Sequence, residues 1–278
     1  MELTEEEVER VVTAALAEDV GPGDVTTEAL VPVSLRCRAQ IVLEEPGVVC
    51  GGPIAAAVFR HLDPSVAVEQ AVDEGVAIRD TPAVVIELEG PGRAVLTGER
   101  VALNVLGRLC GIASLTRRFV ELVDGTGAAI LDTRKTTPGL RALERYAVRC
   151  GRGRNHRDGL YDAILVKENH LRLAGGIPAA AAALRSGPSE LPVEIEAETL
   201  EQVGDALAAG ADRILLDNMS PEQVGEAVSL VSGRADLEAS GGISLATVRS
   251  YAETGVDFIS VGALTHAARS LHVSLEVL

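Results

Sequence analysis

The chain has 278 residues, of which 47% are hydrophobic, and a formal net charge of −16 at pH 7. This length can form one large domain, or a small domain followed by a barrel-sized one. The negative charge repels phosphate backbones, and three Phe, three Tyr and no Trp offer few surfaces on which bases could stack. These properties argue against nucleic-acid binding as the main function.

The sequence also argues against a membrane protein. No segment approaches the roughly 20 consecutive apolar residues of a membrane-spanning helix, and the acidic start, Met1–Glu7, is unlike a signal peptide. The four cysteines lack the spacing of a metal site and predict free thiols in a reducing compartment. They are Cys37, Cys50, Cys110 and Cys150. We therefore expect a cytoplasmic enzyme.

The N-terminal part predicts a small α+β domain, placed at residues 1–105. Apolar residues recur at helical spacing over residues 4–19, where Thr4 and Glu7 form a capping box. The Gly-Pro-Gly-Asp sequence at Gly21–Asp24 then ends the helix. Beyond it, the pattern predicts one further helix at residues 53–61 and short strands at residues 37–43, 66–71 and 83–88.

A long helical stretch follows over residues 97–123, with Gly107 and Gly111 as candidate break points. Short apolar runs then alternate with helical segments, which is typical of parallel βαβ units. The runs cover residues 128–131, 163–166, 193–195, 213–216, 236–239 and 258–261. The helical segments cover residues 140–150, 178–185, 200–209, 221–231, 245–254 and 264–270.

This alternation predicts an α/β fold in which residues 106–278 form an incomplete or closed α/β barrel of six to seven parallel βα units. A doubly wound sheet is the alternative. The barrel is favoured because no Gly-x-Gly-x-x-Gly follows the first strand and because polar groups recur at the strand ends. In a barrel these ends meet at one mouth. The residues at the ends are Asp132, Lys167, Glu196, Asp217, Ser240 and Gly262.

Positive charge is concentrated in one segment of this acidic chain. Residues 134–172 contain ten Lys or Arg against four acids, and they include both lysines of the chain, Lys135 and Lys167. A solvated helix face is the ordinary explanation for a charged segment. The presence of both lysines in this segment favours a local anion-binding site over a solvated helix face. The lysine ammonium group is a compact point charge whose role an arginine does not fill.

The strand ends indicate the kind of ligand. Two Gly-containing turns, Ser240–Ile243 and Ser260–Ala263, each follow a strand and open a helix, an arrangement that binds phosphate. Glu196 and Asp217 suit Mg²⁺ or ribose hydroxyls. The sequence therefore predicts a site for a phosphorylated sugar and a divalent metal.

The segment from residue 134 to residue 157 contains more cationic side chains than one monophosphate needs. This excess predicts a second anionic ligand, such as a polycarboxylate or a pyrophosphate. A lone histidine is usually structural, but His156 lies between Asn155 and Arg157 after a Gly-containing loop, which favours a ligand role. These cations are Arg134, Lys135, Arg141, Arg149, Arg152, Arg154, His156 and Arg157.

Several motifs together resemble the quinolinate phosphoribosyltransferase family, also called nicotinate-nucleotide pyrophosphorylase (carboxylating). The most specific are Asp-Thr-Arg-Lys-Thr-Thr-Pro-Gly-Leu-Arg at residues 132–141 and Asn-His-Arg at residues 155–157. The similarity extends over nearly the whole chain, through motifs at residues 18–27, 98–104, 166–170, 193–196, 215–218 and 238–243. It implies that quinolinate and 5-phosphoribosyl-1-pyrophosphate give nicotinate mononucleotide, pyrophosphate and CO₂, with Mg²⁺, in de novo NAD synthesis.

The resemblance also implies residue roles. Lys135, Lys167, Glu196 and Asp217 would be catalytic, Lys135 meeting the pyrophosphate and the two carboxylates binding ribose hydroxyls and metal. Substrate-binding residues would include Arg134, His156, Arg157 and Lys167 for the quinolinate carboxylates, and Ser240, Gly241, Gly242, Gly262 and His266 for the 5-phosphate. Thr133 would also bind substrate. Arg100 would reach the pocket from the other subunit of a homodimer, which could assemble further.

One position departs from the family, whose loop before Asn-His-Arg is typically three glycines; here it is Gly151-Arg152-Gly153. We expect Arg152 to project into solvent.

Three alternative functions also fit the sequence. They are a ModD-like phosphoribosyltransferase of the same fold that is encoded with molybdate transporters, a Schiff-base aldolase using Lys167, and a non-catalytic protein that binds a phosphate ligand.

Overall fold

The computed structural model describes residues 3–186 and 191–278. They divide into two compact units, each made of several chain segments. Unit 1 contains the chain up to residue 117 together with residues 136–152 and 264–278, and unit 2 contains residues 118–135 and 153–263. The sequence-based boundary at residue 105 stays a prediction. Within the described residues no helix is both long and apolar enough to cross a membrane.

Unit 1 is built on a four-stranded antiparallel sheet with the order β12-β1-β5-β3. Its strands are β1 (Arg36–Leu43), β3 (Ala67–Gln70), β5 (Ala83–Pro91) and β12 (Val273–Val277). A second, two-stranded pairing joins β2 (Gly47–Val48) to β4 (Ala77–Ile78). The C-terminal strand β12 was not expected from the sequence, and it pairs with β1 across more than 200 residues of chain.

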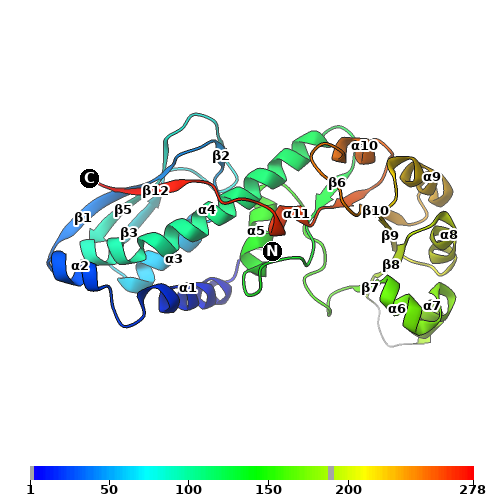
Figure 1. The fold of residues 1–278 in the computed structure, drawn as a ribbon, viewed down its shortest axis with the longest axis horizontal. Coiled ribbons are helices and arrows are strands. Elements are labelled where there is room, and N and C mark those ends of the chain that lie inside the picture. The colour runs from blue at the N-terminus through cyan, green and yellow to red at the C-terminus, as the bar shows by residue number, and fades with distance from the viewer. Residues whose placement is uncertain (1–2, 187–190) are drawn as a thin grey trace. The chain divides into compact units, whose positions relative to one another are not determined.

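Unit 1 also contains helices, and the first four of them lie in the same part of the picture as this sheet (Figure 1). The helices are α1 (Glu5–Val20), α2 (Val25–Leu30), α3 (Gly52–Leu62), α4 (Gly92–Leu122) and α5 (Arg141–Cys150), with the short α11 (Ala263–His266) at the start of the last segment. The predicted capping box is confirmed, because Thr4 and Glu7 cap α1 reciprocally. The core includes Ile41, Ile54 and Phe59, none of which is exposed.

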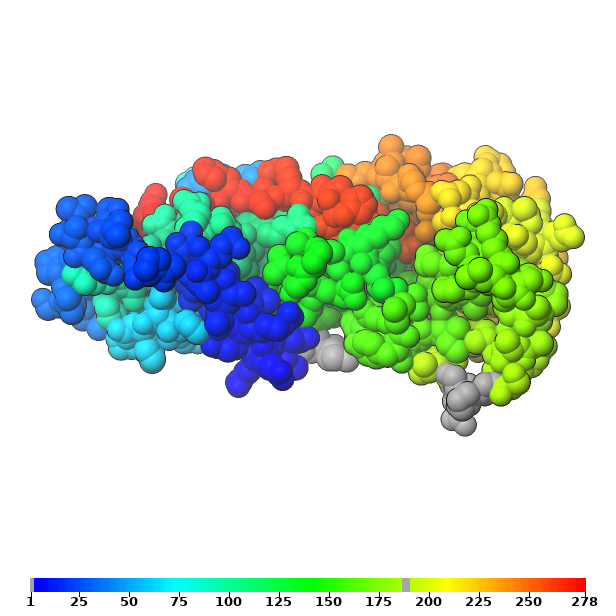
Figure 2. All heavy atoms as spheres, turned by 60° about the horizontal axis from the view of Figure 1, so that its bottom comes forward, coloured from blue at the N-terminus to red at the C-terminus, as the bar shows by residue number. Residues whose placement is uncertain are grey.

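The expected break in the long helix is wrong. Helix α4 runs unbroken over 31 residues. Its glycines serve close packing instead. A Cβ on Gly107 would lie 2.7 Å from the carbonyl oxygen of Leu271, and one on Gly111 would overlap the carbonyl oxygen of Arg269. The helix of 264–270 is also shorter than expected, because α11 ends at His266 and the chain then runs along α4 to β12. Figure 2 shows this C-terminal segment, in red, on the surface beside α4, in teal.

Unit 2 contains a six-stranded parallel sheet with the order β6-β11-β10-β9-β8-β7. Its strands are β6 (Ala129–Leu131), β7 (Ile164–Val166), β8 (Val193–Ala197), β9 (Arg213–Asp217), β10 (Asp236–Ser240) and β11 (Phe258–Ser260). The first strand pairs with the last, as in a barrel, and the order never reverses as it would in a doubly wound sheet. The predicted α/β class is confirmed, with six strands and β6 and β7 as the two edges among the described residues.

Helices connect the strands of unit 2 and lie outside the curved sheet (Figure 1). They are α6 (Glu168–Ala174), α7 (Ile177–Ser186), α8 (Leu200–Ala208), α9 (Pro221–Val231) and α10 (Val248–Ala252). Thr199 and Ser220 cap α8 and α9 through their hydroxyl groups. Helix α6, which begins directly after Lys167, was not predicted. Its presence brings the start of a helix to the end of β7.

The close approach at Gly111 gives a test of unit 1. We expect Gly111→Ala to lower the free energy of unfolding by about 1–3 kcal/mol, because the added methyl group displaces the C-terminal segment from α4. Gly204→Ala is the matched control, since Gly204 lies in α8 with nothing within 4 Å of the added atom. That change should stabilise by roughly 0.5–1 kcal/mol. Chemical denaturation measures both, and equal effects would contradict the packing described here.

Candidate functional site

The carboxyl ends of the parallel strands form one edge of unit 2, and most of the predicted site residues gather there. A cavity of about 240 Å³ opens at this edge. It is lined by Thr133, Arg134, Lys135, His156, Arg157, Leu165, Lys167, Leu215, Glu238, Ser240 and Ser260. Seven of these eleven residues were predicted as site residues from the sequence.

A lysine and two carboxylates form the acidic side of the site. The Lys167 ammonium lies 3.3 Å from Glu196 Oε2, and the backbone N–H of Glu168 donates to Glu196 Oε1 at 3.2 Å. Burial and the nearby charge of Glu196 raise the pKa of Asp217, while Lys167 and Lys135 oppose that rise. The structure therefore brings Lys135, Lys167, Glu196 and Asp217 within electrostatic reach of one another. Two carboxylates that repel each other in this way suit a bound cation or a pair of hydroxyl donors.

Behind the cavity, His156 is held by two buried glutamates. Its Nε2 lies 3.1 Å from Glu194 Oε2 and 3.4 Å from Glu238 Oε2, and Arg213 in turn contacts Glu238 at 3.2 Å. Burial alone would lower the pKa of His156, but the hydrogen bonds to Glu194 and Glu238 raise it to about 9. The raised pKa favours the charged imidazole at neutral pH, where it pairs with the two carboxylates.

One contact opposes that charge. The backbone N–H of Arg157 donates to His156 Nδ1 at 2.7 Å, which requires that nitrogen to be unprotonated. A single neutral hydrogen bond is weaker than the attraction of two buried carboxylates, so the charged ring prevails. In the neutral ring, the same bond leaves the remaining proton on Nε2, where it still faces Glu194 and Glu238.

Asp132 positions the loop that carries His156. It follows β6 directly, is fully buried, and accepts hydrogen bonds from Asn155 Nδ2 at 2.5 Å and from the backbone N–H of His156 at 2.8 Å. A parallel bridge between Leu131 and Arg154 continues the sheet beside it. The motifs at residues 132–141 and 155–157 are thus joined by one buried carboxylate.

Two guanidinium groups form the basic side of the cavity. Burial and the charge of Arg134 lower the pKa of Arg157, so the two cations lie close enough to repel each other. The Nη1 of Arg157 donates to the carbonyl oxygen of Ala163 at 3.1 Å, which fixes the orientation of its side chain. Like charges held together beside a cavity favour an anionic ligand, because it relieves their repulsion.

The turns after the last strands keep their backbone open. Gly241 and Gly242 have φ values of 99° and 60°, in the left-handed region that favours glycine. A Cβ at Gly241 would overlap the side chain of Asn218, whereas Gly242 has nothing within 4 Å. Gly262 follows β11 at the same edge of the sheet. Backbone N–H groups in such turns can approach a phosphate closely.

Two predicted residues belong to unit 1 rather than to this edge of unit 2. Arg100 lies in α4 with a 63% exposed side chain, 3.9 Å from Glu99, and His266 is the last residue of α11. Arg152 is exposed, as expected, and has a φ of 69°. That left-handed conformation explains why glycine suits this position.

Sequence reasoning missed the buried charges inside the sheet. The sequence pattern places Glu194 and Glu238 within apolar runs and Arg213 at the start of one. The period of two along a strand was the available signal: Glu194 shares a face with Glu196, and Glu238 shares one with Ser240. Charged residues on that face of a buried strand point to an interior polar cluster.

Comparison with known proteins matches both parts of the chain. Residues 24–110 match the family model of the quinolinate phosphoribosyl transferase N-terminal domain, and residues 112–276 match that of the C-terminal domain. A probable nicotinate-nucleotide pyrophosphorylase (carboxylating) of Bacillus subtilis is 43% identical over 94% of this chain and 90% of its own length. The Mycobacterium leprae enzyme of that name is 42% identical over 96% and 95%. The structure of the nicotinate-nucleotide pyrophosphorylase from Francisella tularensis has a TM-score of 0.95 at 39% identity, covering 100% of this chain and 98% of the other.

The pKa of His156 gives a pH test. Because its value of about 9 in the folded protein exceeds the ordinary 6.5, the charged ring stabilises the fold fully below pH 6.5. That stabilisation is lost as the pH rises through 9. We expect denaturation midpoints to fall over this range, and His156→Gln to remove much of the fall. The same replacement at His61, in α3 of unit 1, controls for loss of an imidazole elsewhere. An unchanged slope in His156→Gln would contradict the assignment.

Proposed function

The chain belongs to the quinolinate phosphoribosyltransferase family, and we propose that it converts quinolinate and 5-phosphoribosyl-1-pyrophosphate into nicotinate mononucleotide, pyrophosphate and CO₂ in de novo NAD synthesis. It is thus a decarboxylating pentosyltransferase. The observation that supports this most directly is the cavity at the strand ends, which is lined by paired guanidinium groups and by Lys167, with the carboxylates of Glu196 and Asp217 close to that lysine. A dicarboxylate and an activated sugar phosphate complement those two sets of charges.

Binding of the pyridine would fall to the basic side. Arg134, Arg157 and Lys167 line the cavity together with His156, and the three cations can neutralise the two quinolinate carboxylates. Thr133 lines the same wall. Holding both carboxylates orients the ring nitrogen toward the sugar, and orientation of two reactants can supply about 7–11 kcal/mol of the barrier.

The sugar would lie against the acidic side and the glycine turns. Glu196 and Asp217 would bind ribose hydroxyls and stabilise the positive charge that develops on the ribose as pyrophosphate departs. Lys135 would meet the leaving pyrophosphate. The 5-phosphate would bind at Ser240, Gly241, Gly242 and Gly262, and the family resemblance also assigns His266 to it.

The same carboxylates fit a divalent metal. The raised pKa of Asp217, caused by burial and by Glu196, indicates a donor pair that a cation would relieve. Mg²⁺ held there would neutralise charge on the pyrophosphate as it leaves. Once the pyridine nitrogen is ribosylated, its positive charge stabilises the carbanion left by CO₂. This chain supplies positioning and charge, and no protein nucleophile is required.

The environment of Lys167 argues against the aldolase alternative. Its side chain is 51% exposed and forms an ion pair with Glu196. A lysine that forms Schiff bases is usually desolvated in an apolar pocket or activated by another cation. Lys167 is better suited to hold an anion.

The reaction itself is the primary test. Purified protein should consume quinolinate and release pyrophosphate and CO₂ only when both substrates and Mg²⁺ are supplied. Removal of the metal with a chelator should abolish turnover, and added Mg²⁺ should restore it. A panel of other pyridine carboxylates separates this function from the ModD-like alternative. Faster turnover of a monocarboxylate than of quinolinate, or binding without pyrophosphate release, would overturn the proposal.

We further propose a cytoplasmic homodimer in which Arg100 of one subunit completes the site of the other. Arg100→Ala and Lys167→Ala should each lower kcat/KM by roughly a hundredfold or more. A mixture of the two variants that has been dissociated and reassembled should recover up to about a quarter of wild-type activity, because half of the dimers then hold one intact site.

The control for this experiment is Arg172→Ala. Arg172 lies on α6 near Lys167, is 70% exposed and pairs only within its helix with Glu168 among the contacts described. It should keep wild-type activity. No recovery in the mixture, with both variants folded and dimeric, would exclude a shared site.

A further inference from the structure

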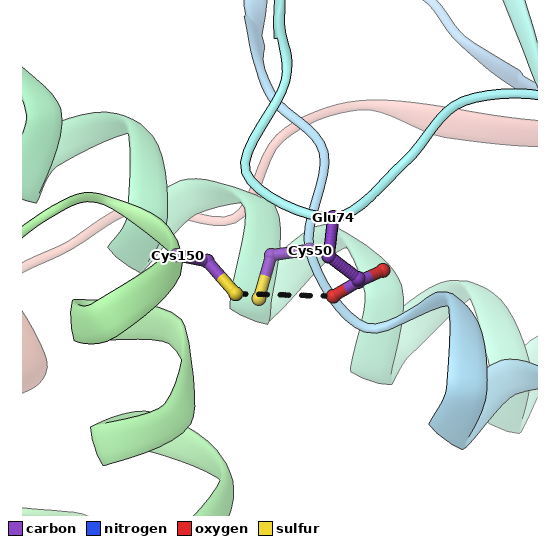
Figure 3. Close-up of side chains that lie close together, drawn as sticks. All are labelled: Cys50, Glu74 and Cys150. Carbon is purple, nitrogen blue, oxygen red and sulfur yellow. Dashed lines mark hydrogen bonds between the residues drawn. The ribbon is translucent and has the colours of Figure 1, made fainter. Parts of the chain in front are cut away.

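Three of the four cysteines lie together in unit 1, outside the site at the strand ends. Cys50 precedes α3 and is fully buried, whereas Cys150 ends α5 and is partly exposed. The sulfur atoms of Cys50 and Cys150 and a carboxylate oxygen of Glu74 all lie within 4.8 Å of one another. Figure 3 shows the two sulfur atoms next to each other, with Glu74 beyond Cys50.

The backbones of both cysteines are held in place. The Cys50 N–H donates to the sulfur of Cys110 at 3.2 Å, and the Cys110 thiol donates to the Cys50 carbonyl at 3.3 Å. On the other side, Arg117 donates to the carbonyl oxygens of Cys150 at 3.2 Å and of Gly151 at 3.3 Å. The two thiols are therefore held close to each other by the surrounding backbone.

A metal ion fits this cluster poorly, because Glu74 already has other partners. Its Oε2 accepts from the Gly51 N–H at 2.8 Å and from the Tyr146 hydroxyl at 2.9 Å. Its Oε1 accepts from the Gly52 N–H at 2.9 Å and from Gln70 at 3.3 Å. These bonds use the lone pairs of the carboxylate and cap the start of α3. Two adjacent thiols without a free third ligand suit disulfide formation better than metal binding.

The two thiols are chemically unequal. The hydrogen bond from Cys50 lowers the pKa of Cys150, with Tyr146 and Arg149 adding to the effect, while burial and the charge of Glu74 oppose it. Burial and the neighbouring Cys150 raise the pKa of Cys50 well above its ordinary value. Thiolate character and exposure both determine which cysteine reacts first. Cys150 therefore has the properties of an attacking thiol, and Cys50 those of a resolving thiol.

We propose that Cys50 and Cys150 form a reversible, oxidisable dithiol site in which Cys150 reacts first with a hydroperoxide. The Cys150 thiolate attacks a peroxide oxygen, the O–O bond breaks, and Cys150 becomes a sulfenic acid while hydroxide leaves. The Cys50 sulfur then attacks the Cys150 sulfur and displaces its hydroxyl group as water. In total, two thiols and one hydrogen peroxide give one disulfide and two waters. The bond ties the start of α3 to the end of α5.

Peptide mapping of the full chain tests the bond directly. Arginines at 149 and 152 flank Cys150, so trypsin releases Cys150–Arg152, and the next arginine after Arg38 is Arg60. Reduced protein is treated with hydrogen peroxide, its remaining thiols are alkylated, and it is then digested. We expect residues 150–152 disulfide-linked to residues 39–60, with loss of two of the four thiols and recovery after dithiothreitol. A link through Cys37 or Cys110, or no link, would overturn the proposal.

Single variants test the order of the two steps. Cys50→Ser should accumulate a sulfenic acid at Cys150 that dimedone traps, and Cys150→Ser should slow oxidation of Cys50 at least tenfold. Cys37→Ser is the matched control and should form the disulfide at the wild-type rate. Oxidation of Cys50 at an unchanged rate in Cys150→Ser would refute the proposed order. The mapping of the wild-type chain stands whether or not the variants fold, and neither measurement depends on the proposed enzymatic reaction.

Discussion

The contact of His156 with Glu194 and Glu238 sits inside the parallel sheet, and the rest of the site is arranged around it. Burying two carboxylates is costly unless cations compensate them, and here His156 and Arg213 do so. The backbone N–H of His156 is in turn fixed by Asp132 at the end of β6. The orientation of the Asn155–Arg157 loop thus depends on three buried acids, none of which needs to touch a substrate.

Repulsion between like charges is the common feature of the cavity edge. Arg134 lies close enough to lower the pKa of Arg157, and Glu196 raises that of Asp217. A fold does not keep such pairs for stability, because each costs free energy that an uncharged pair would not. Ligands of opposite charge relieve both pairs at once. An anion is needed on one side, and hydroxyl groups or a cation on the other.

The local sequence pattern predicted most of the strands and helices. Hydrophobic periodicity, helix-capping residues and turn residues all act between positions that are close together in the chain. The pattern also predicted the residues at the strand ends, since parallel strands share an edge. It did not predict β12, whose pairing with β1 is a long-range contact. The glycines of α4 were misread for the same reason: a close approach of Arg269 and Leu271 leaves no local sign. Glu194 and Glu238 were missed because apolar neighbours concealed their face of the sheet.

An acidic chain can bind anionic substrates here because its positive charges are concentrated in one segment. Residues 134–172 carry a net positive charge within a chain of −16. Inside the sheet, the negative charges of Glu194 and Glu238 are compensated by His156 and Arg213. Barrels of this type host many chemistries, so the sheet alone does not select a substrate. Selection rests on which strand end carries which charge, and here cations line the cavity while Glu196 and Asp217 end neighbouring strands of the same sheet.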